Sequence, residues 1–151
     1  MDRSEKAIFT NMCMIYDGNG KILVQDRVNS NWPGITFPGG HVNKGESFSQ
    51  SVIREVDEET GLQIKSPMLC GVKQFQTNED ERYIVLLYKT CQFEGELKSS
   101  EEGKVFWIQR EDLHHYELAN DFEKMLEVFE SDTLNEFFYD QQGENWRVKL
   151  F

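Results

Sequence analysis

The sequence predicts an α/β fold of the α+β kind, in which helices cover the faces of a mixed β-sheet. Three observations lead to this prediction. Strand-like segments stand both before and after one strongly marked helix. The 151 residues suit one compact domain with its own core, and 38% hydrophobic with 13% aromatic residues is the composition of a folded chain. The sequence contains no repeat or linker, so we expect residues 1–151 to form a single domain.

The individual elements follow from hydrophobic patterns and turn residues. Strands are expected at residues 6–16, 21–28, 68–77, 82–93 and 104–109. The sequence "DGNG" between the first two strands predicts a hairpin turn, and residues 29–40, with two of the three prolines, predict a loop. A helix follows this loop and ends at Gly61, which suits a C-terminal cap. A second helix is expected over about residues 121–130, and the aromatic tail over 136–151 is expected to pack onto the body.

Charge and cysteine content limit the partners and the compartment. A net charge of -11 argues against a stable nucleic-acid complex or an anionic membrane surface, and no stretch has the pattern of a signal peptide or membrane helix. Cys13, Cys70 and Cys91 lie far apart without a C-x-x-C pair, so we expect reduced core thiols in a cytoplasmic protein. The sequence leaves the oligomeric state open.

The first helix carries an unusual concentration of carboxylates. At about 100° per residue, Glu55 and Glu59 fall at the edge of its inward face, which is marked by Phe48, Val52 and Val56, while Glu58 lies further round. Two partly buried carboxylates one turn apart repel each other unless a cation lies between them. Mg²⁺ is the simplest such cation. The alternative is a solvated acidic helix in which Arg54 and Glu58 form an ordinary surface pair.

The spacing of this segment resembles the signature of a known family. From Gly40 to Leu62 the residues follow the pattern G-x5-E-x7-R-E-apolar-x-E-E-x-G-apolar. This pattern resembles that of the Nudix hydrolases, which cleave nucleoside diphosphates linked to another group. The signature spans only about a sixth of the chain. The resemblance implies an α/β/α sandwich with a mixed β-sheet.

The resemblance also implies roles for individual residues. Hydrolysis of a phosphoanhydride needs neutralised phosphates and a positioned water molecule, so Mg²⁺ or Mn²⁺ is the expected cofactor. The expected metal ligands are Gly39, Gly40, Glu55, Glu58, Glu59 and Glu102. The two glycines are alternatives for one backbone carbonyl close to the metal. Glu55 and Glu58 are also expected to act in catalysis, with Arg54 orienting the glutamates. Glu46 is either a neighbour of the helix N-cap or a ligand through water.

The flanking segments "TFPGGHVNKGES", "SSEEGKVFWI" and "LAND" are similar to the MutT-type 8-oxo-dGTP diphosphatases. This resemblance implies attack at the β phosphorus, which gives a nucleoside monophosphate and pyrophosphate. It implies that Glu102, or its neighbour Glu101, completes the metal site, and that Asn120 pairs with the oxidised purine. The alternative for Asn120 is a helix N-cap box with Glu123.

Other residues and substrates leave further alternatives. Arg27 is the expected phosphate contact among four basic candidates, Arg27, Lys44, Lys73 and Arg82. Trp32 either lines a pocket or plugs one, and His114 and His115 are interpreted as a polar helix end. ADP-ribose, dinucleoside polyphosphates and RNA 5′ ends are the alternative substrates. The ADP-ribose and dinucleoside enzymes carry a proline and a tyrosine, respectively, beyond the signature, but no proline follows Pro67 and Tyr83 lies too far downstream. A non-catalytic binding module is expected to lose glutamates from the signature, and this chain retains them all.

Overall fold

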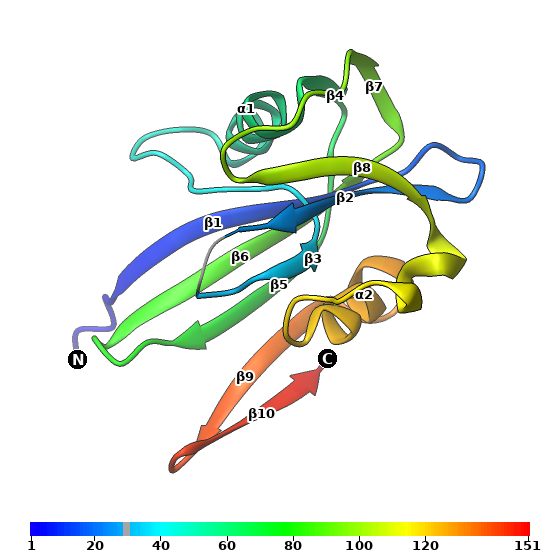
Figure 1. Cartoon of the computed structure of the whole chain (residues 1–151). Coiled ribbons are helices and arrows are strands. Elements are labelled where there is room, and N and C mark those ends of the chain that lie inside the picture. Colours follow the sequence, from blue (N-terminus) through cyan, green and yellow to red (C-terminus); the bar gives the residue numbers. More distant parts are fainter. Residues whose placement is uncertain (29–30) are drawn as a thin grey trace.

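The computed structural model describes residues 1–28 and 31–151 (Figure 1). In chain order its elements are β1 (Lys6–Ile15), β2 (Lys21–Arg27), β3 (Gly34–Thr36), α1 (Phe48–Thr60), β4 (Leu62–Lys65), β5 (Met68–Gln76), β6 (Glu81–Thr90), β7 (Gln92–Gly95), β8 (Gly103–Gln109), the short 3-10 helix η1 (Arg110–His115), α2 (Phe122–Glu130), β9 (Glu136–Gln142) and β10 (Asn145–Leu150).

The described strands form one large sheet and two smaller ones. The large sheet has the order β1-β6-β5-β9-β10 and is mixed, since β1 and β6 are parallel, as are β5 and β9, while the other neighbours are antiparallel. The second sheet has the order β3-β2-β8, and the third pairs β4 with β7. The predicted α+β class with a mixed sheet is confirmed.

The two helices cover opposite faces of the large sheet, because alternate residues of its central strands enter two separate cores. On β1, Met12 and Met14 belong to the core that α2 completes, whereas Cys13 and Ile15 belong to the core that α1 completes. Figure 1 shows α1 and α2 on the two sides of β1 and β6. This layering is the α/β/α sandwich that the resemblance implies.

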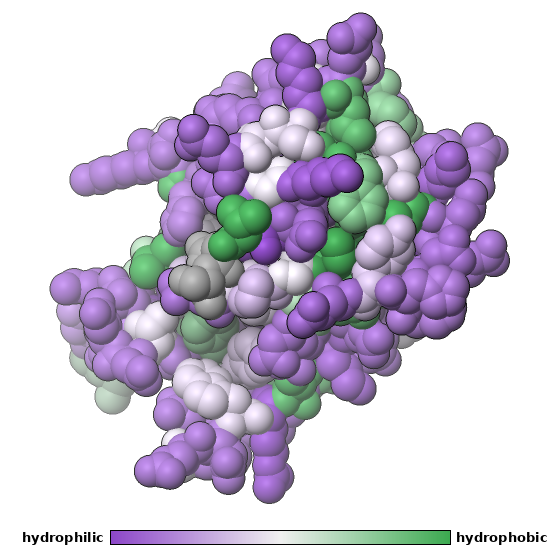
Figure 2. All heavy atoms as spheres, in the orientation of Figure 1, coloured by the Kyte–Doolittle hydropathy of each residue, from purple (hydrophilic) through white to green (hydrophobic). Residues whose placement is uncertain are grey.

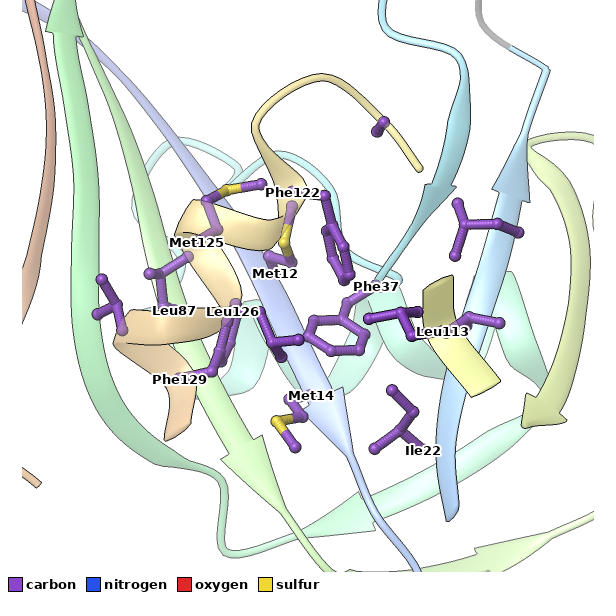
Figure 3. Close-up of a cluster of buried hydrophobic side chains, with 14 of the residues drawn as sticks. Met12, Met14, Ile22, Phe37, Leu87, Leu113, Phe122, Met125, Leu126 and Phe129 are labelled. Carbon is purple, nitrogen blue, oxygen red and sulfur yellow. The ribbon is translucent and has the colours of Figure 1, made fainter. Parts of the chain in front are cut away.

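The larger core is packed with aromatic rings. Phe37 meets Phe122 and Phe129 of α2 edge to face, with ring centres 4.9 and 5.1 Å apart, and Met12 lies beside them (Figure 3). This packing fixes the segment that enters α1 against α2. On the face that Figure 2 shows, the surface is mostly hydrophilic, with hydrophobic side chains gathered in small patches, which agrees with the strongly acidic composition.

The predicted hairpin between residues 6–16 and 21–28 is wrong. β1 pairs with β6, β2 pairs with β3 and β8, and only an isolated bridge joins Tyr16 to Ile22. The Asp17 side chain accepts hydrogen bonds from the amides of Asn19 and Lys21, so a local turn reverses the chain without a ladder. The turn residues indicate the reversal, but they do not determine which sheet each strand joins.

Several other elements differ from the expectation. The predicted loop over 29–40 contains the strand β3, while its first two residues lie outside the described residues. The predicted strand over 82–93 is divided between β6 and β7, and β4 was not predicted. The tail does pack onto the body, as the hairpin β9–β10, which extends the large sheet beyond β5.

The three cysteines are free thiols in different environments. Cys13 is fully buried and Cys70 is half-buried, but Cys91 is exposed, so the expectation of core thiols is wrong for Cys91. His114 and His115 lie in the last turn of η1, in agreement with a polar helix end. No helix in the described residues is long and apolar enough to cross a membrane.

Candidate active site

A cavity of about 740 Å³ lies on the α2 side of the large sheet. Its floor consists of alternate residues on neighbouring strands, which therefore share one face: Thr10 and Met12 on β1, Tyr83 and Val85 on β6, Lys73 and Phe75 on β5, and Tyr139 on β9. The remaining lining comes from Asn11 on β1, from the chain around β2 and β3, from α1 and from two loops. The cavity thus brings together residues from most of the chain.

Helix α1 turns two glutamates toward this cavity. It begins after Ser47, whose hydroxyl accepts from the amide of Gln50, and it ends at Gly61 in the left-handed conformation with φ 79°, as predicted. Glu55 and Glu59 both line the cavity, so their predicted inward position is confirmed. Phe48 is wrong as a marker of the inward face, because its side chain is 42% exposed and stacks on Phe9.

Glu59 is buried and held by neutral donors. It is 6% exposed, and its Oε2 accepts hydrogen bonds from the amide of Gly39 at 3.1 Å and from Nε2 of Gln25 at 3.2 Å. The pKa of Glu59 is raised to about 7, mainly by burial and also by the charges of Glu55 and Glu102, and the two hydrogen bonds oppose this rise. These three carboxylates therefore share one end of the cavity.

The composition of this end fits a divalent cation. Glu55, Glu59 and Glu102 offer the oxygen ligands that Mg²⁺ prefers, and their mutual repulsion is relieved by a positive ion. The Glu55 carboxylate lies directly against Gly40, since a Cβ there would be 2.3 Å from it. Among the described residues no three acidic, histidine or cysteine side chains are already arranged as a metal site. The glutamates instead bond to protein donors.

Arg54 connects α1 to the loop that precedes it. Its guanidinium donates to both carboxylate oxygens of Glu46, at 2.8 and 3.0 Å, to Glu55 at 3.0 Å, to Glu58 at 3.2 Å and to the carbonyl of His41 at 3.0 Å. Arg54 lowers the pKa of the Glu46 carboxyl to about 2. Glu46 thus holds Arg54 and does not line the cavity. The Arg54–Glu58 pair is present, but as part of this network.

The structure brings most of the predicted site residues to one cavity. Those that line it are Gly39, Gly40, Glu55, Glu59, Glu102, Arg27 and Asn120. Glu58 and Arg54 do not line it, and the Glu58 side chain is 59% exposed beside Arg54. Of Glu101 and Glu102, only Glu102 lines the cavity.

The two glycines differ in the use of their carbonyl groups. The Gly40 carbonyl accepts from the amide of Asn11 at 2.8 Å, and the Asn11 side chain accepts from the Gly40 amide at 3.1 Å. Among the described residues nothing donates to the Gly39 carbonyl, which is therefore the better placed of the two for a metal. A Cβ on Gly39 would lie 2.0 Å from the Asn11 carbonyl oxygen, so no other residue fits there.

The helix-cap interpretation of Asn120 is wrong. The N-cap of α2 is Asp121, which has φ 61° and makes no side-chain cap bond, because its carboxylate accepts from the Tyr139 hydroxyl instead. The Asn120 carbonyl accepts from Nε1 of Trp32 at 3.0 Å, and Asn120 itself lines the cavity. Trp32 lines the cavity as well, so it does not merely plug it.

Some site residues were missed by sequence reasoning. Gln25 is fully buried and holds Glu59, and the signal for it was a polar residue inside the apolar run of β2. Tyr139 belongs to the aromatic tail over 136–151, for which the sequence predicts packing onto the body but no role in the site. Of the four basic candidates, Arg27 and Lys73 line the cavity, whereas Arg82 bonds to Glu5 and to Gln74 outside it. The described residues leave the Arg27 Nε atom buried without a hydrogen-bond partner.

This fold and site define a small α+β protein in which the carboxylates of one helix face a cavity that also has aromatic walls. Residues 9–129 match the family model of the NUDIX domain. The chain therefore belongs to the Nudix family.

Known relatives carry different names. The chain is 32% identical over 104 residues to the uncharacterized Nudix hydrolase YvcI of Bacillus subtilis. The matched segment covers 66% of this chain and 65% of that protein, slightly less than two thirds of its length. It is 32% identical over 118 residues to an ADP-ribose pyrophosphatase of Methanocaldococcus jannaschii, covering 76% of this chain and 69% of that protein. The crystal structure of a MutT protein from Bacillus halodurans superimposes with a TM-score of 0.73 at 27% identity, covering 93% of this chain and 97% of that one.

Proposed function

We propose that this chain is a metal-dependent pyrophosphohydrolase that splits 8-oxo-dGTP into 8-oxo-dGMP and pyrophosphate, and so removes an oxidised nucleotide from the pool. One observation carries the proposal: the carboxylates of Glu55, Glu59 and Glu102 line the same cavity as Trp32 and Asn120. A cavity with carboxylates at one end and an aromatic ring with an amide elsewhere suits a nucleotide with its metal-bound phosphates.

In this proposal the metal is held by Glu55, Glu59, Glu102 and the Gly39 carbonyl, with Glu58 or the Gly40 carbonyl as further ligands. A bound Mg²⁺ or Mn²⁺ supplies neutralisation of the phosphates and an activated water. Arg54 positions Glu55 and Glu58 through its N–H groups. The Nε of Arg27, which has no hydrogen-bond partner among the described residues, is a donor for a phosphate oxygen.

The reaction is tested by incubating the protein with 8-oxo-dGTP, dGTP and ADP-ribose with Mg²⁺ in ¹⁸O-labelled water. From the two nucleoside triphosphates we expect the nucleoside monophosphate and pyrophosphate as products, with the label in pyrophosphate, because attack is proposed at the β phosphorus, whereas hydrolysis of ADP-ribose would release AMP and ribose 5-phosphate. Label in the monophosphate would mean attack at the α phosphorus. Nucleotide binding without product under any divalent metal would indicate a non-catalytic module.

A second candidate is hydrolysis of ADP-ribose, which the name of the M. jannaschii relative favours. In the same screen, a higher kcat/KM for ADP-ribose than for 8-oxo-dGTP would support this candidate.

We further propose that residues 1–151 form one domain, because β9 and β10 lie beyond residues 9–129 yet complete the large sheet. Three free thiols support a reducing, cytoplasmic location.

Asn120→Ser is expected to lower the preference for 8-oxo-dGTP over dGTP by about tenfold or more, because serine cannot present an amide to the base. The free energy of unfolding is expected to stay within about 0.5 kcal/mol of the parent, since the Asn120 side chain makes no cap bond. Steady-state kinetics on both nucleotides and a denaturant titration give the two values. Unchanged discrimination would remove Asn120 from base recognition.

A further inference from the structure

Lys73 on β5 is a buried cation that faces the cavity. It is 8% exposed and lines the cavity, and its Nζ atom lies 5.1 Å from the ring centre of Trp32, 5.2 Å from that of Phe137 and 5.1 Å from that of Tyr139. Three aromatic faces thus surround one ammonium group. Attraction between a cation and ring faces partly offsets the cost of its burial.

The described residues provide no hydrogen-bond acceptor for this ammonium group. Lys73 makes no hydrogen bond among them and has no carboxylate within 4.0 Å. Asp121 is the acidic group that acts on it electrostatically, but its carboxylate accepts from Tyr139. Burial lowers the pKa of Lys73 to about 8, and Asp121 raises it, so the cationic form still predominates at pH 7. Aromatic rings attract the charge, but among the described residues they leave the three N–H donors without protein oxygen partners and facing the cavity.

Lys73 lies near the residues that are proposed to bind the base. Trp32 contacts both Lys73 and Asn120. Its ring faces the Lys73 ammonium, and its indole N–H donates to the Asn120 carbonyl. The other cation beside Trp32, Arg27, is connected to the acidic end, because the next residue, Val28, donates to the Glu102 carbonyl at 3.3 Å. Arg27 is therefore nearer to the phosphates, and Lys73 is the cation available to the base.

We propose that Lys73 is a specificity-determining residue that donates a hydrogen bond to the O6 oxygen of a guanine-type base. Guanine and 8-oxoguanine both carry an acceptor at this position, whereas adenine carries an amino group, which is a donor. The adenine amino group would face the Lys73 ammonium as a second donor, so the two groups repel each other and neither finds an acceptor. Lys73 therefore selects guanine nucleotides against adenine nucleotides. This inference rests on the proposed function, and it disfavours ADP-ribose as the substrate.

The test compares dGTP with dATP, which differ only in the base. Lys73→Met keeps the length of the side chain and removes the donor. The control is Lys104→Met, because Lys104 also lies over a ring, 5.8 Å from the centre of Phe106, but does not line the cavity. We expect Lys73→Met to lower kcat/KM for dGTP about tenfold or more, and to leave that for dATP unchanged or to raise it, because the substitution removes the repulsion of the adenine amino group. Lys104→Met is expected to change neither.

Equal losses on both nucleotides would overturn the proposal, because a phosphate contact or a purely structural role treats the two bases alike. No loss on dGTP, or a parent enzyme that prefers dATP, would overturn it as well.

If Lys73→Met does not fold, the kinetic comparison is replaced by calorimetric binding of dGMP and dAMP to the parent protein. Equal affinities would then contradict the proposal. The same calorimetry separates the two hypotheses. If the parent hydrolyses no nucleotide, the proposed function fails, while tighter binding of dGMP that Lys73→Met abolishes still supports Lys73.

Discussion

Glu59→Gln is expected to lower kcat by about a hundredfold or more at saturating Mg²⁺, while the protein stays folded. The substitution keeps the size of a side chain that is 6% exposed and removes the charge that faces Glu55 and Glu102. Pyrophosphate release measures the rate. A control is Glu94→Gln, because Glu94 pairs with Lys65 at 3.6 Å on the small sheet of β4 and β7 and does not line the cavity. Full turnover by Glu59→Gln would rule out a metal role for this residue.

The same substitution is expected to change how stability depends on pH in the presence of a chelator. The folded-state pKa of Glu59, about 7, lies above its ordinary value of 4.5, so the folded protein retains a proton that the unfolded chain releases. The contribution of Glu59 to the free energy of unfolding is therefore fully present below about pH 4.5. It is lost as the pH rises to about 7, which lowers the free energy of unfolding by about 3 kcal/mol. Glu59→Gln removes this loss and is expected to unfold at a higher temperature than the parent at pH 8.

Thermal unfolding at pH 5, 6, 7 and 8 in chelator checks this expectation by the difference between the two proteins. Glu46 does not contribute to it, because its pKa of about 2 lies below the window. Mg²⁺ is expected to stabilise the parent at pH 8 more than at pH 5, since the metal binds the ionised carboxylate. Parallel curves for the parent and Glu59→Gln would contradict the raised pKa.

Arg54→Lys is expected to lower kcat about tenfold to a hundredfold and to raise the Mg²⁺ concentration needed for half-maximal rate. Arginine meets both oxygens of Glu46 and reaches Glu55 and Glu58 at the same time. A lysine keeps the charge but is a point donor without the planar fork. Glu55 would then lose the donor that fixes its carboxylate beside Gly40.

The control is Arg110→Lys, because Arg110 makes an equally close bidentate contact with Glu130, at 2.8 and 2.8 Å, outside the cavity. It is expected to leave kcat and the Mg²⁺ requirement unchanged. If both variants lost stability equally and neither changed the Mg²⁺ requirement, Arg54 would be a structural residue only. Titration of Mg²⁺ at fixed nucleotide distinguishes the two outcomes.

The parts of the site that the sequence predicted are local ones. The inward position of Glu55 and Glu59 follows from the helical period alone, and Gly61 ends α1 because a left-handed residue is needed there. Phe48 obeys the same period but lies in the first turn, where it meets Phe9 on the edge strand β1. The period determines the direction of a side chain, and the neighbouring elements decide whether anything covers it.

The parts that the sequence did not predict depend on contacts between distant segments. β1 pairs in parallel with β6, so that Lys6 lies opposite Glu81, and no local signal specifies that partner. The rings around Lys73 come from Trp32 near β3 and from Phe137 and Tyr139 on β9. The two rings of β9 reach Lys73 through the register of β5 on β9, in which Lys73 is opposite Phe137, and Trp32 reaches it from the segment before β3. Sequence patterns report periods and turns, whereas register is set by the assembled sheet.

The position of the hairpin β9–β10 has a consequence for how such a protein diversifies. The hairpin lies beyond residues 9–129, yet Phe137 and Tyr139 supply two of the three rings beside Lys73. The glutamates of α1 and Arg54 all lie within residues 9–129. Two of the rings that surround Lys73 are thus encoded outside the stretch that carries the glutamates of α1, whereas Lys73, Trp32 and Asn120 lie within that stretch. A lineage, or a protein engineer, can therefore vary the rings beside Lys73 by changes in the terminal hairpin while the glutamates of α1 are inherited unchanged.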